Sequence, residues 1–295
     1  MPLQGESAPL RLAIAGDLHG QWDLSDHALL ERLAPDALLV VGDLSDGTPR
    51  IPALLRQLPL PVACILGNHD TAKDPSGRTL ARQIEALGPL HCGWGLRELT
   101  PPGLSVVGAR PGTAGGGFHL SKACSALFGP LSCEQSAGRI AAAAAAADPA
   151  RPLVLLAHSG PAGLGSEASD ICGRDWKSPA CDWGDQDLTL AIDRIRRQRA
   201  LPLVVFGHMH HRLRRGAGER RSFAVDRAGT AYLNAACVPR HLVDEAGVAL
   251  RHFSWVELDA DGLRSAAHRW YDLEGRLRYE ERLLDRAPLS AAAPC

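Results

Sequence analysis

Five short apolar runs, each ending in residues that commonly bind metal ions, constrain the fold of this chain more than any other feature. They are LAIAGDLHG, LLVVGDLSDG, CILGNHD, LVLLAHSGP and LVVFGHMH. Each run has the length and the Val, Ile, Leu and Ala content of a strand buried in a parallel sheet. In open α/β sheets, ligands bind just beyond the carboxyl ends of the strands. The pattern therefore predicts an α/β fold in which five polar clusters converge on one site.

The polar residues after these runs offer enough ligands for two metal ions. The candidates with oxygen or imidazole ligands are Asp17, Asp43, Asn68, His19, His158, His208 and His210. This set exceeds what one tetrahedral ion takes and suits two ions that share a bridging carboxylate. Mixed imidazole and oxygen ligation without thiolate indicates manganese, iron or zinc. Two divalent ions about 3.5–4 Å apart can activate a hydroxide for attack on phosphorus.

Each motif taken alone has an ordinary structural explanation. GDLHG or GNHD could be a turn, because Gly, Asn and Asp tolerate the backbone geometry of turns. A single histidine after a strand, such as His158, is more often a packed core or loop residue than a ligand. The ordered set D-x-H, GD, GNHD, H and GHxH, each after an apolar run, favours a metal site instead.

The ordered set resembles the calcineurin-like metallophosphoesterase superfamily over residues 10–240. The resemblance implies an α/β fold in which a two-sheet β-sandwich is flanked by helices, in four layers (αββα), rather than one doubly wound sheet. The implied ligands are Asp17, His19 and His210 for one ion, Asn68, His158 and His208 for the other, and Asp43 as the bridge. The family mechanism implies that a metal-bridging hydroxide attacks phosphorus while His69, paired with Asp70, protonates the leaving oxygen.

Branches of the superfamily differ in the residues around these motifs. GDLHGQ resembles the Ser/Thr protein phosphatases, but LSDG and Leu66 stand where those enzymes have phosphate-binding arginines. The GHMH ending is similar to a broad group of bacterial phosphatases, phosphodiesterases and nucleases. The stretches HSGPAGLG, ICGRDW, GDQDL and FSWVELD also resemble an uncharacterised branch of cyanobacteria and plastids, which implies no substrate. We predict phosphomonoester hydrolysis, with phosphodiesterase or nuclease activity as one alternative and a non-catalytic scaffold as another.

Segments outside the motifs offer candidate substrate contacts. Besides Asn68, the segment 170–187 carries Arg174, which could grip a phosphate, Trp176, which could stack on a base or sugar, and Lys177. Ordinary loop packing is the alternative for this segment. The Gly-rich segment 111–130 could also form a functional loop or a plain surface insertion. We expect a phosphorylated small molecule or a nucleotide as the substrate.

The arginine-rich segment 211–227 has the composition of a nucleic-acid patch, but its interleaved acidic residues favour a solvated hairpin. After it, the segments 230–238, 252–262 and 267–275 have the pattern of strands, and we expect them to close the second sheet.

Composition limits the class of protein. A chain of 295 residues with 45% hydrophobic side chains can bury a large core and lies near the upper size of one domain. The formal net charge of −1 argues against nucleic acid or a membrane as partner. The alanine run at 141–147 is too short to cross a membrane, and the N-terminus lacks a signal pattern, so we expect a cytoplasmic protein. We expect one domain at 10–285, an N-terminal tail at 1–9 and a disordered tail at 286–295.

Overall fold

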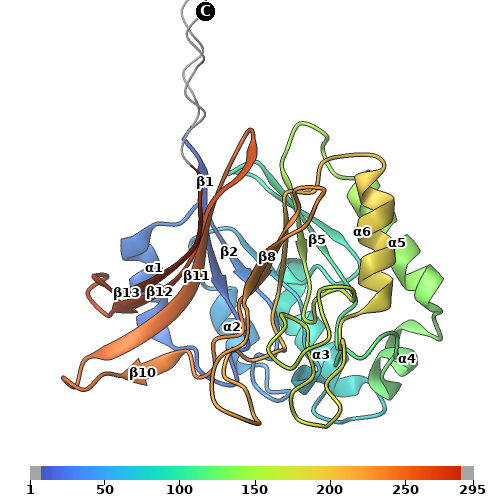
Figure 1. Cartoon of the computed structure of the whole chain (residues 1–295), viewed down its shortest axis with the longest axis horizontal. Helices are drawn as coiled ribbons and strands as arrows, with labels where there is room; N and C mark the ends of the chain where they lie inside the picture. Colours follow the sequence, from blue (N-terminus) through green and yellow to red (C-terminus); the bar gives the residue numbers. More distant parts are fainter. Residues whose placement is uncertain (1–7, 287–295) are drawn as a thin grey trace, which may run out of the picture.

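Two mixed β-sheets packed against each other form the centre of the molecule, and helices cover their outer faces (Figure 1). The computed structural model describes residues 8–286. The strands of the first sheet are β1 (Leu10–Ala15), β2 (Ala37–Val40), β3 (Val62–Cys64), β10 (His241–Val243), β11 (Ala249–Asp259), β12 (Gly262–Asp272) and β13 (Leu277–Asp285). The strands of the second sheet are β4 (Leu96–Leu99), β5 (Leu104–Gly108), β6 (Leu153–Leu156), β7 (Leu203–Phe206), β8 (Phe223–Val225) and β9 (Ala231–Asn234). The predicted two-sheet sandwich is confirmed.

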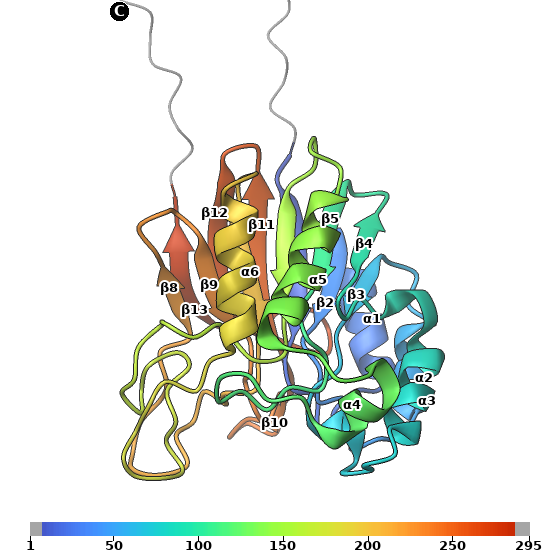
Figure 2. The same cartoon turned by 90° about the vertical axis from the view of Figure 1, so that its right-hand side faces the viewer.

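The strand order explains why the predicted site residues meet. The first sheet has the order β13-β12-β11-β1-β2-β3, with β10 beside β11, and the second has the order β4-β5-β6-β7-β9-β8. Within the first sheet β1, β2 and β3 run parallel, and within the second β5, β6, β7 and β9 do. The loops that follow these parallel strands gather at the lower side of the molecule (Figure 2).

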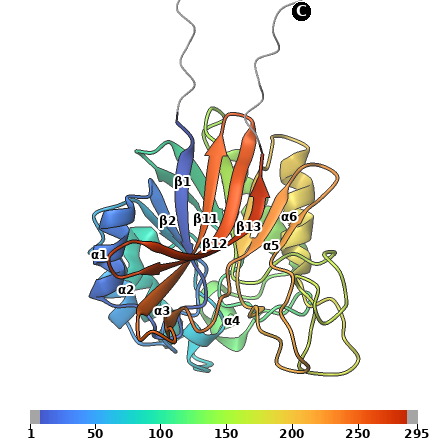
Figure 3. The ribbon, with the colours of Figure 1, turned by 60° about the vertical axis from the view of Figure 1, so that its left-hand side comes forward.

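The late strands do not all join the second sheet, as the sequence pattern had suggested. β9 does extend that sheet beside β7. β11, however, pairs antiparallel with β1, and β12 and β13 continue the first sheet beyond it (Figure 3). The prediction that the segments 252–262 and 267–275 close the second sheet is therefore wrong.

Burial on both sides explains why the parallel strands are apolar throughout. In β1, Leu12 and Ile14 pack into the cluster that includes the second sheet, whereas Ala13 and Ala15 pack with helices on the outer face. The helices are α1 (Leu24–Leu33), α2 (Arg50–Leu55), α3 (Arg78–Leu87), α4 (Lys122–Phe128), α5 (Cys133–Ala145) and α6 (Gln186–Arg196), with 3-10 turns η1 (His69–Thr71) and η2 (Gly88–Leu90). Residues of α1, α2 and α3 cover the first sheet, and those of α5 and α6 cover the second. This arrangement gives the four layers αββα.

Local signals fix where two of these helices begin. The side chain of Asp23 accepts a hydrogen bond at the start of α1, and Asp26 completes a capping box. Ser132 and Gln135 form the same arrangement at the start of α5. None of the helices in residues 8–286 has the length and apolarity needed to cross a membrane. The predicted tails at 1–9 and 286–295 lie outside the described residues, apart from positions 8, 9 and 286.

A buried ion-pair cluster fastens α1, and the loop that precedes it, to the start of β10. Arg240 Nη1 lies 2.9 Å from Asp26 Oδ1, and His241 Nε2 lies 3.1 Å from Asp26 Oδ2. The backbone N–H of Arg240 also donates to Gln21 Oε1 at 2.8 Å. Burial alone would raise the pKa of Asp26, but the Arg240 charge and the His241 hydrogen bond outweigh it and lower this pKa to about 2.

Replacing Asp26 with alanine is expected to lower the free energy of unfolding by about 3–5 kcal/mol, because Arg240 would stay buried without its partner. Urea denaturation measures the loss. In the parent protein this contribution should be complete above the unfolded-state pKa of about 4 and should fade as the pH falls toward 2, because the folded-state pKa is the lower one. Glu134→Ala is the matched control, since Glu134 pairs with Arg194 at the surface, where such pairs contribute about 0–1 kcal/mol. Equal losses in the two variants would show that the buried cluster does not stabilise the fold.

Candidate metal centre

The loops after β1, β2 and β7 hold four predicted ligands in left-handed backbone conformations. The φ angles are 38° at Asp17, 42° at His19, 48° at Asp43 and 67° at His208. Non-glycine residues rarely adopt such angles, which cost about 1–3 kcal/mol each and cluster at functional sites. The surrounding fold therefore holds these four side chains in conformations that they would not adopt by themselves.

The glycines of the motifs leave room for the carboxylates. A Cβ atom on Gly207 would collide with the carboxylate of Asp17, and one on Gly67 would collide with that of Asp43. The backbones of the GHMH and GNHD loops thus pack directly against the two acidic side chains. This contact explains why each of the two motifs begins with glycine.

One group of potential ligands comprises Asp17, His19 and His210. The Nε2 atoms of His19 and His210 lie 3.3 Å apart, and His210 Nε2 lies 3.2 Å from Asp17 Oδ2. The backbone N–H of His208 donates to both Asp17 carboxylate oxygens at 3.0 Å and fixes the carboxylate in place. One ligand atom from each of the three residues lies within 4.8 Å of the others.

A second group comprises Asp43, His158 and His208, with Asn68 beside it. His158 Nε2 lies 3.4 Å from Asp43 Oδ1 and 3.0 Å from Asn68 Oδ1. His158 Nδ1 donates to the carbonyl of Val41 at 2.8 Å, which leaves Nε2 as the ligand atom. Nε2 of His208 is buried and has no hydrogen-bond partner among the described residues. Such an atom is costly unless an ion occupies the space in front of it.

Asp43 lies between the two groups. Its Oδ2 atom is 3.9 Å from His19 Nε2, while its Oδ1 atom is 3.4 Å from His158 Nε2. The backbone N–H of His69 donates to Asp43 Oδ1 at 2.8 Å. The structure thus brings all the predicted ligands to one place, with a single carboxylate facing both groups.

The pKa values of the buried ligands show that their carboxylates interact strongly with nearby positive charge. Burial alone would raise the pKa of Asp43, but His158 and His208 hold it well below its usual range. Burial alone would lower the pKa of His158, yet Asp43 and Asp17 raise it to about 10. Burial, reinforced by the His158 charge, lowers the pKa of His208 to about 4. Buried carboxylates beside imidazoles form a donor set that fits divalent metal ions, which would take the place of the proton between Asp43 and His158.

His69 lies beside both groups, but its partner differs from the predicted one. Its Nδ1 atom is 2.8 Å from Oδ1 of Asp46. The carboxylate of Asp70 instead accepts the backbone N–H groups of Leu44 and Gly67, both at 2.8 Å. The predicted pairing of Asp70 with His69 is therefore wrong, because Asp70 braces the loops after β2 and β3 against each other. Burial, followed by the Asp43 charge, raises the pKa of Asp70 to about 7.

A cavity of about 190 Å³ opens beside the two groups. It is lined by Asn68, His69, Asp175, Trp176, His208, Met209, His210, Arg212, Arg214 and Arg220. Two of the predicted substrate contacts, Asn68 and Trp176, therefore lie in its wall.

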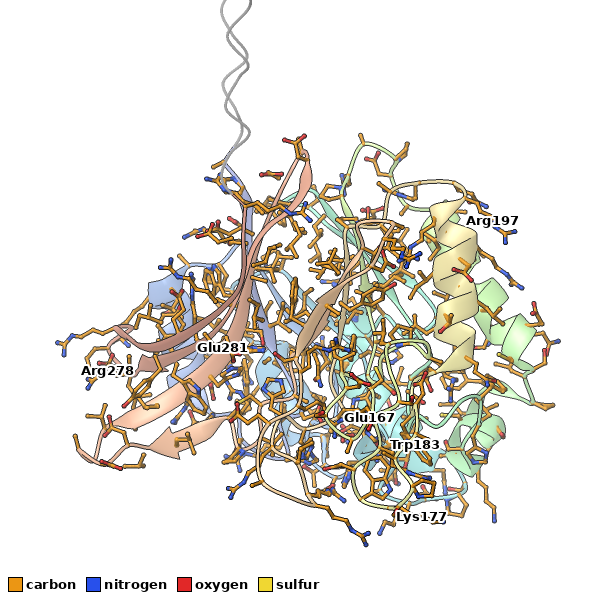
Figure 4. The ribbon with its side chains drawn as sticks, viewed as in Figure 1. Glu167, Lys177, Trp183, Arg197, Arg278 and Glu281 are labelled. Carbon is orange, nitrogen blue, oxygen red and sulfur yellow. The ribbon has the colours of Figure 1, made fainter. Side chains whose placement is uncertain are left out.

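The predicted contacts of Arg174 and Lys177 with substrate are not supported by the geometry. Arg174 donates to the carbonyl of Pro179 at 2.7 Å, and its guanidinium lies 5.0 Å from the ring centre of Trp183. Lys177 is exposed at the outer edge of its loop (Figure 4). Neither residue lines the cavity.

Sequence reasoning assigned Arg212 and Arg214 to a solvated hairpin and missed their place in this wall. A usable signal was present in the spacing, because His210, Arg212 and Arg214 alternate along the chain. Alternate residues of an extended segment point to the same side. Arginines two and four positions after a candidate ligand can thus share its side of the segment.

Comparisons with known proteins agree with this architecture. A sequence model of the family "Calcineurin-like phosphoesterase" matches residues 10–212. Among solved structures, the fold is similar to that of the protein TT1561 from Thermus thermophilus (TM-score 0.52, 14% identity, covering 90% of this chain and 100% of that one). It is also similar to a dimetal phosphatase from Danio rerio (TM-score 0.51, 11% identity, covering 94% of this chain and 99% of that one). No curated protein matches the sequence significantly.

Proposed function

Because the chain belongs to the calcineurin-like phosphoesterase family, we propose that it hydrolyses phosphomonoesters with the help of two divalent metal ions. The observation that carries the proposal is the position of Asp43, whose two carboxylate oxygens face two separate groups of imidazole and oxygen ligands. The buried Nε2 atom of His208, which has no hydrogen-bond partner in the part of the chain that the structure describes, supports it.

In this proposal Asp17, His19 and His210 would hold one ion, and Asn68, His158 and His208 the other, with Asp43 shared. Bound there, the ions would lower the pKa of a water to near neutrality and offset the negative charge of the phosphate. Manganese, iron and zinc all suit mixed imidazole and oxygen ligands. The carbonyl of Val41 would orient the His158 ring toward its ion.

His69 would act as the general acid. It lies outside the groups Asp17–His19–His210 and Asp43–His158–His208, although it forms a further group of potential ligands with His19 and Asp46. It lines the cavity, and its ring centre is 5.0 Å from that of His19. A positioned imidazole that protonates the leaving oxygen contributes typically about 10²–10⁴-fold to the rate. Asp46 would be a positioning residue, because its carboxylate accepts from Nδ1 and leaves Nε2 to carry the proton that is transferred.

Asp46→Asn is expected to lower kcat on alkyl phosphates by about tenfold, since a less well oriented imidazole protonates a poor leaving group less effectively. Hydrolysis of p-nitrophenyl phosphate, whose leaving group departs as an anion, should change by less than about twofold. Steady-state kinetics on both substrates measure the difference. Asp46→Glu should restore part of the loss. A uniform loss on both substrates, or unchanged rates on both, would show that Asp46 does not act through His69.

The proposed activity is tested by assaying protein reconstituted with manganese, iron or zinc against p-nitrophenyl phosphate, bis-p-nitrophenyl phosphate and single-stranded DNA. We expect the highest kcat/KM on the monoester, with loss of activity after chelation. Faster cleavage of the diester or of DNA would replace the proposal with a phosphodiesterase or nuclease. Failure of the fully metal-loaded protein to hydrolyse any of them would indicate a non-catalytic scaffold.

A further inference from the structure

Three arginines line the cavity beside the candidate metal centre, and only one of them forms an ion pair within the described residues. Arg220 in its wall forms an ion pair with Asp175, at 3.3 Å between Nη2 and Oδ1. Arg212 and Arg214 line the same cavity, and neither forms an ion pair within the described residues 8–286. Apart from the candidate metal ligands, the lining thus holds three guanidinium groups and one carboxylate. Glu219 lies opposite Arg212 in the hairpin but does not line the cavity.

The backbone that carries these two arginines is firmly anchored. The side chain of Arg220 donates from Nε to the carbonyl of His210 at 3.2 Å and from Nη1 to the carbonyls of Ala168 and Asp170 at 2.8 and 2.9 Å. The backbone N–H of Arg214 donates to the carboxylate of Asp175. These bonds join the loop after β7 to the loop that carries Trp176. The backbone at Arg212 and Arg214 is thus held in place, while their guanidinium groups remain available to bind an anion.

The size of the cavity limits what these groups can bind. Its volume of about 190 Å³ is below the range of about 300–1,000 Å³ that encloses drug-sized ligands. Guanidinium groups prefer carboxylate and phosphate, which they bind through paired hydrogen bonds. A compact molecule with an anionic group close to its phosphate would fill this space and offset its charge, while Trp176 supplies an apolar wall.

We propose that the substrate is a compact phosphate ester with a second anionic group, phosphate or carboxylate, and that Arg212 and Arg214 bind this second group. This inference rests on the proposed function, because it assigns the scissile phosphate to the metal centre and the second anion to the arginines that line the same cavity. Arg212 and Arg214 are then specificity-determining residues, and they take no part in the bond cleavage.

Three substrates with the same three-carbon skeleton test the proposal. Glycerol bisphosphate carries a second phosphate, phosphoglycerate a carboxylate and glycerol phosphate only hydroxyl groups. We expect metal-loaded wild-type protein to show a kcat/KM at least about tenfold higher for one or both of the first two than for glycerol phosphate, as a charge-assisted hydrogen bond warrants. The double variant R212Q/R214Q should lose about 10- to 100-fold on the favoured substrates and less than about threefold on glycerol phosphate.

Arg215→Gln is the matched control, because Arg215 lies in the same hairpin and is exposed but does not line the cavity. Equal kcat/KM values on the three substrates, or a double variant that behaves like the control, would overturn the inference while the proposed hydrolysis stands. Hydrolysis of p-nitrophenyl phosphate but of none of the three would also overturn the inference and leave the proposed function standing. If p-nitrophenyl phosphate is not hydrolysed either, the proposed function fails, and calorimetric binding of glycerol bisphosphate to the metal-loaded protein still tests the arginines. Weaker binding by the double variant alone would support their role, and equal binding by both proteins would overturn it.

Discussion

Asp43→Asn should release both metal ions and lower phosphatase activity by more than about 10³-fold, which corresponds to about 4 kcal/mol of transition-state stabilisation. The two carboxylate oxygens of Asp43 face His19 on one side and His158 on the other, at 3.9 and 3.4 Å. Asparagine keeps the shape of the side chain but removes the negative charge that two cations would share. Elemental analysis of the protein after gel filtration measures the number of ions per chain.

The loss of metal ions in Asp43→Asn must be compared with that in a control variant in which another Asp is replaced by Asn. Asp193→Asn serves as this control, because Asp193 is exposed on α6 and belongs to none of the potential ligand groups. We expect this control to retain two ions and full activity. Retention of two ions by Asp43→Asn would contradict the assignment of Asp43 as the bridge.

His69→Asn should separate chemistry from metal binding. Because His69 lies outside the groups Asp17–His19–His210 and Asp43–His158–His208, its replacement should leave the metal content unchanged. The value of kcat on alkyl phosphates should fall by about 10²–10⁴-fold, because their poor leaving groups need a proton in the transition state. The loss on p-nitrophenyl phosphate should be much smaller, because this leaving group departs as an anion.

The outcome at His69 distinguishes three roles. Equal losses on both types of substrate would indicate that His69 only stabilises charge on the phosphate. Loss of metal together with activity would make it a ligand, a role that its contact with Asp46 and its closeness to His19 would permit. His119→Asn is the control, because His119 is exposed and does not line the cavity.

The sequence is most informative where local pattern and topology coincide. The apolar runs that become β1, β2, β3, β6 and β7 are buried on both sides, so their continuous Val, Ile, Leu and Ala content could be recognised. Parallel pairing brings the carboxyl ends of β1, β2 and β3 to one edge of the first sheet and those of β6 and β7 to one edge of the second. The packing of the two sheets places both edges on the same side of the molecule (Figure 2). For this reason the amino-acid sequence alone is enough to predict that the ligand positions Asp17, Asp43 and His158 lie together.

Features that depend on loop conformation could not be predicted in this way. Asp70 follows His69 directly in the sequence, but the turn η1 directs its carboxylate to backbone N–H groups of two loops. Asp46 reaches His69 from another loop, where its own backbone is left-handed with φ of 47°. The choice between these two partners depends on how the loops after β2 and β3 fold against each other.

Contacts between distant parts of the chain explain the other features that differ from the predictions made from the sequence. Strand β11 carries apolar residues on both faces and could have joined either sheet, and its antiparallel pairing with β1 is a contact between distant parts of the chain. The hairpin with Arg212 and Arg214 joins the cavity because Arg220 and Asp175 tie it to the loop of Trp176. The pairing of β11 with β1 and the ion pair of Arg220 with Asp175 leave no periodic signal in the sequence, whereas the alternation of His210, Arg212 and Arg214 does.

Anomalous diffraction from crystals of manganese- or zinc-loaded protein tests the central claim most directly. The two-ion account predicts two anomalous peaks, one bounded by Asp17, His19 and His210 and one by Asn68, His158 and His208, with Asp43 in contact with both. A single peak, or peaks located away from Asp43, would contradict it.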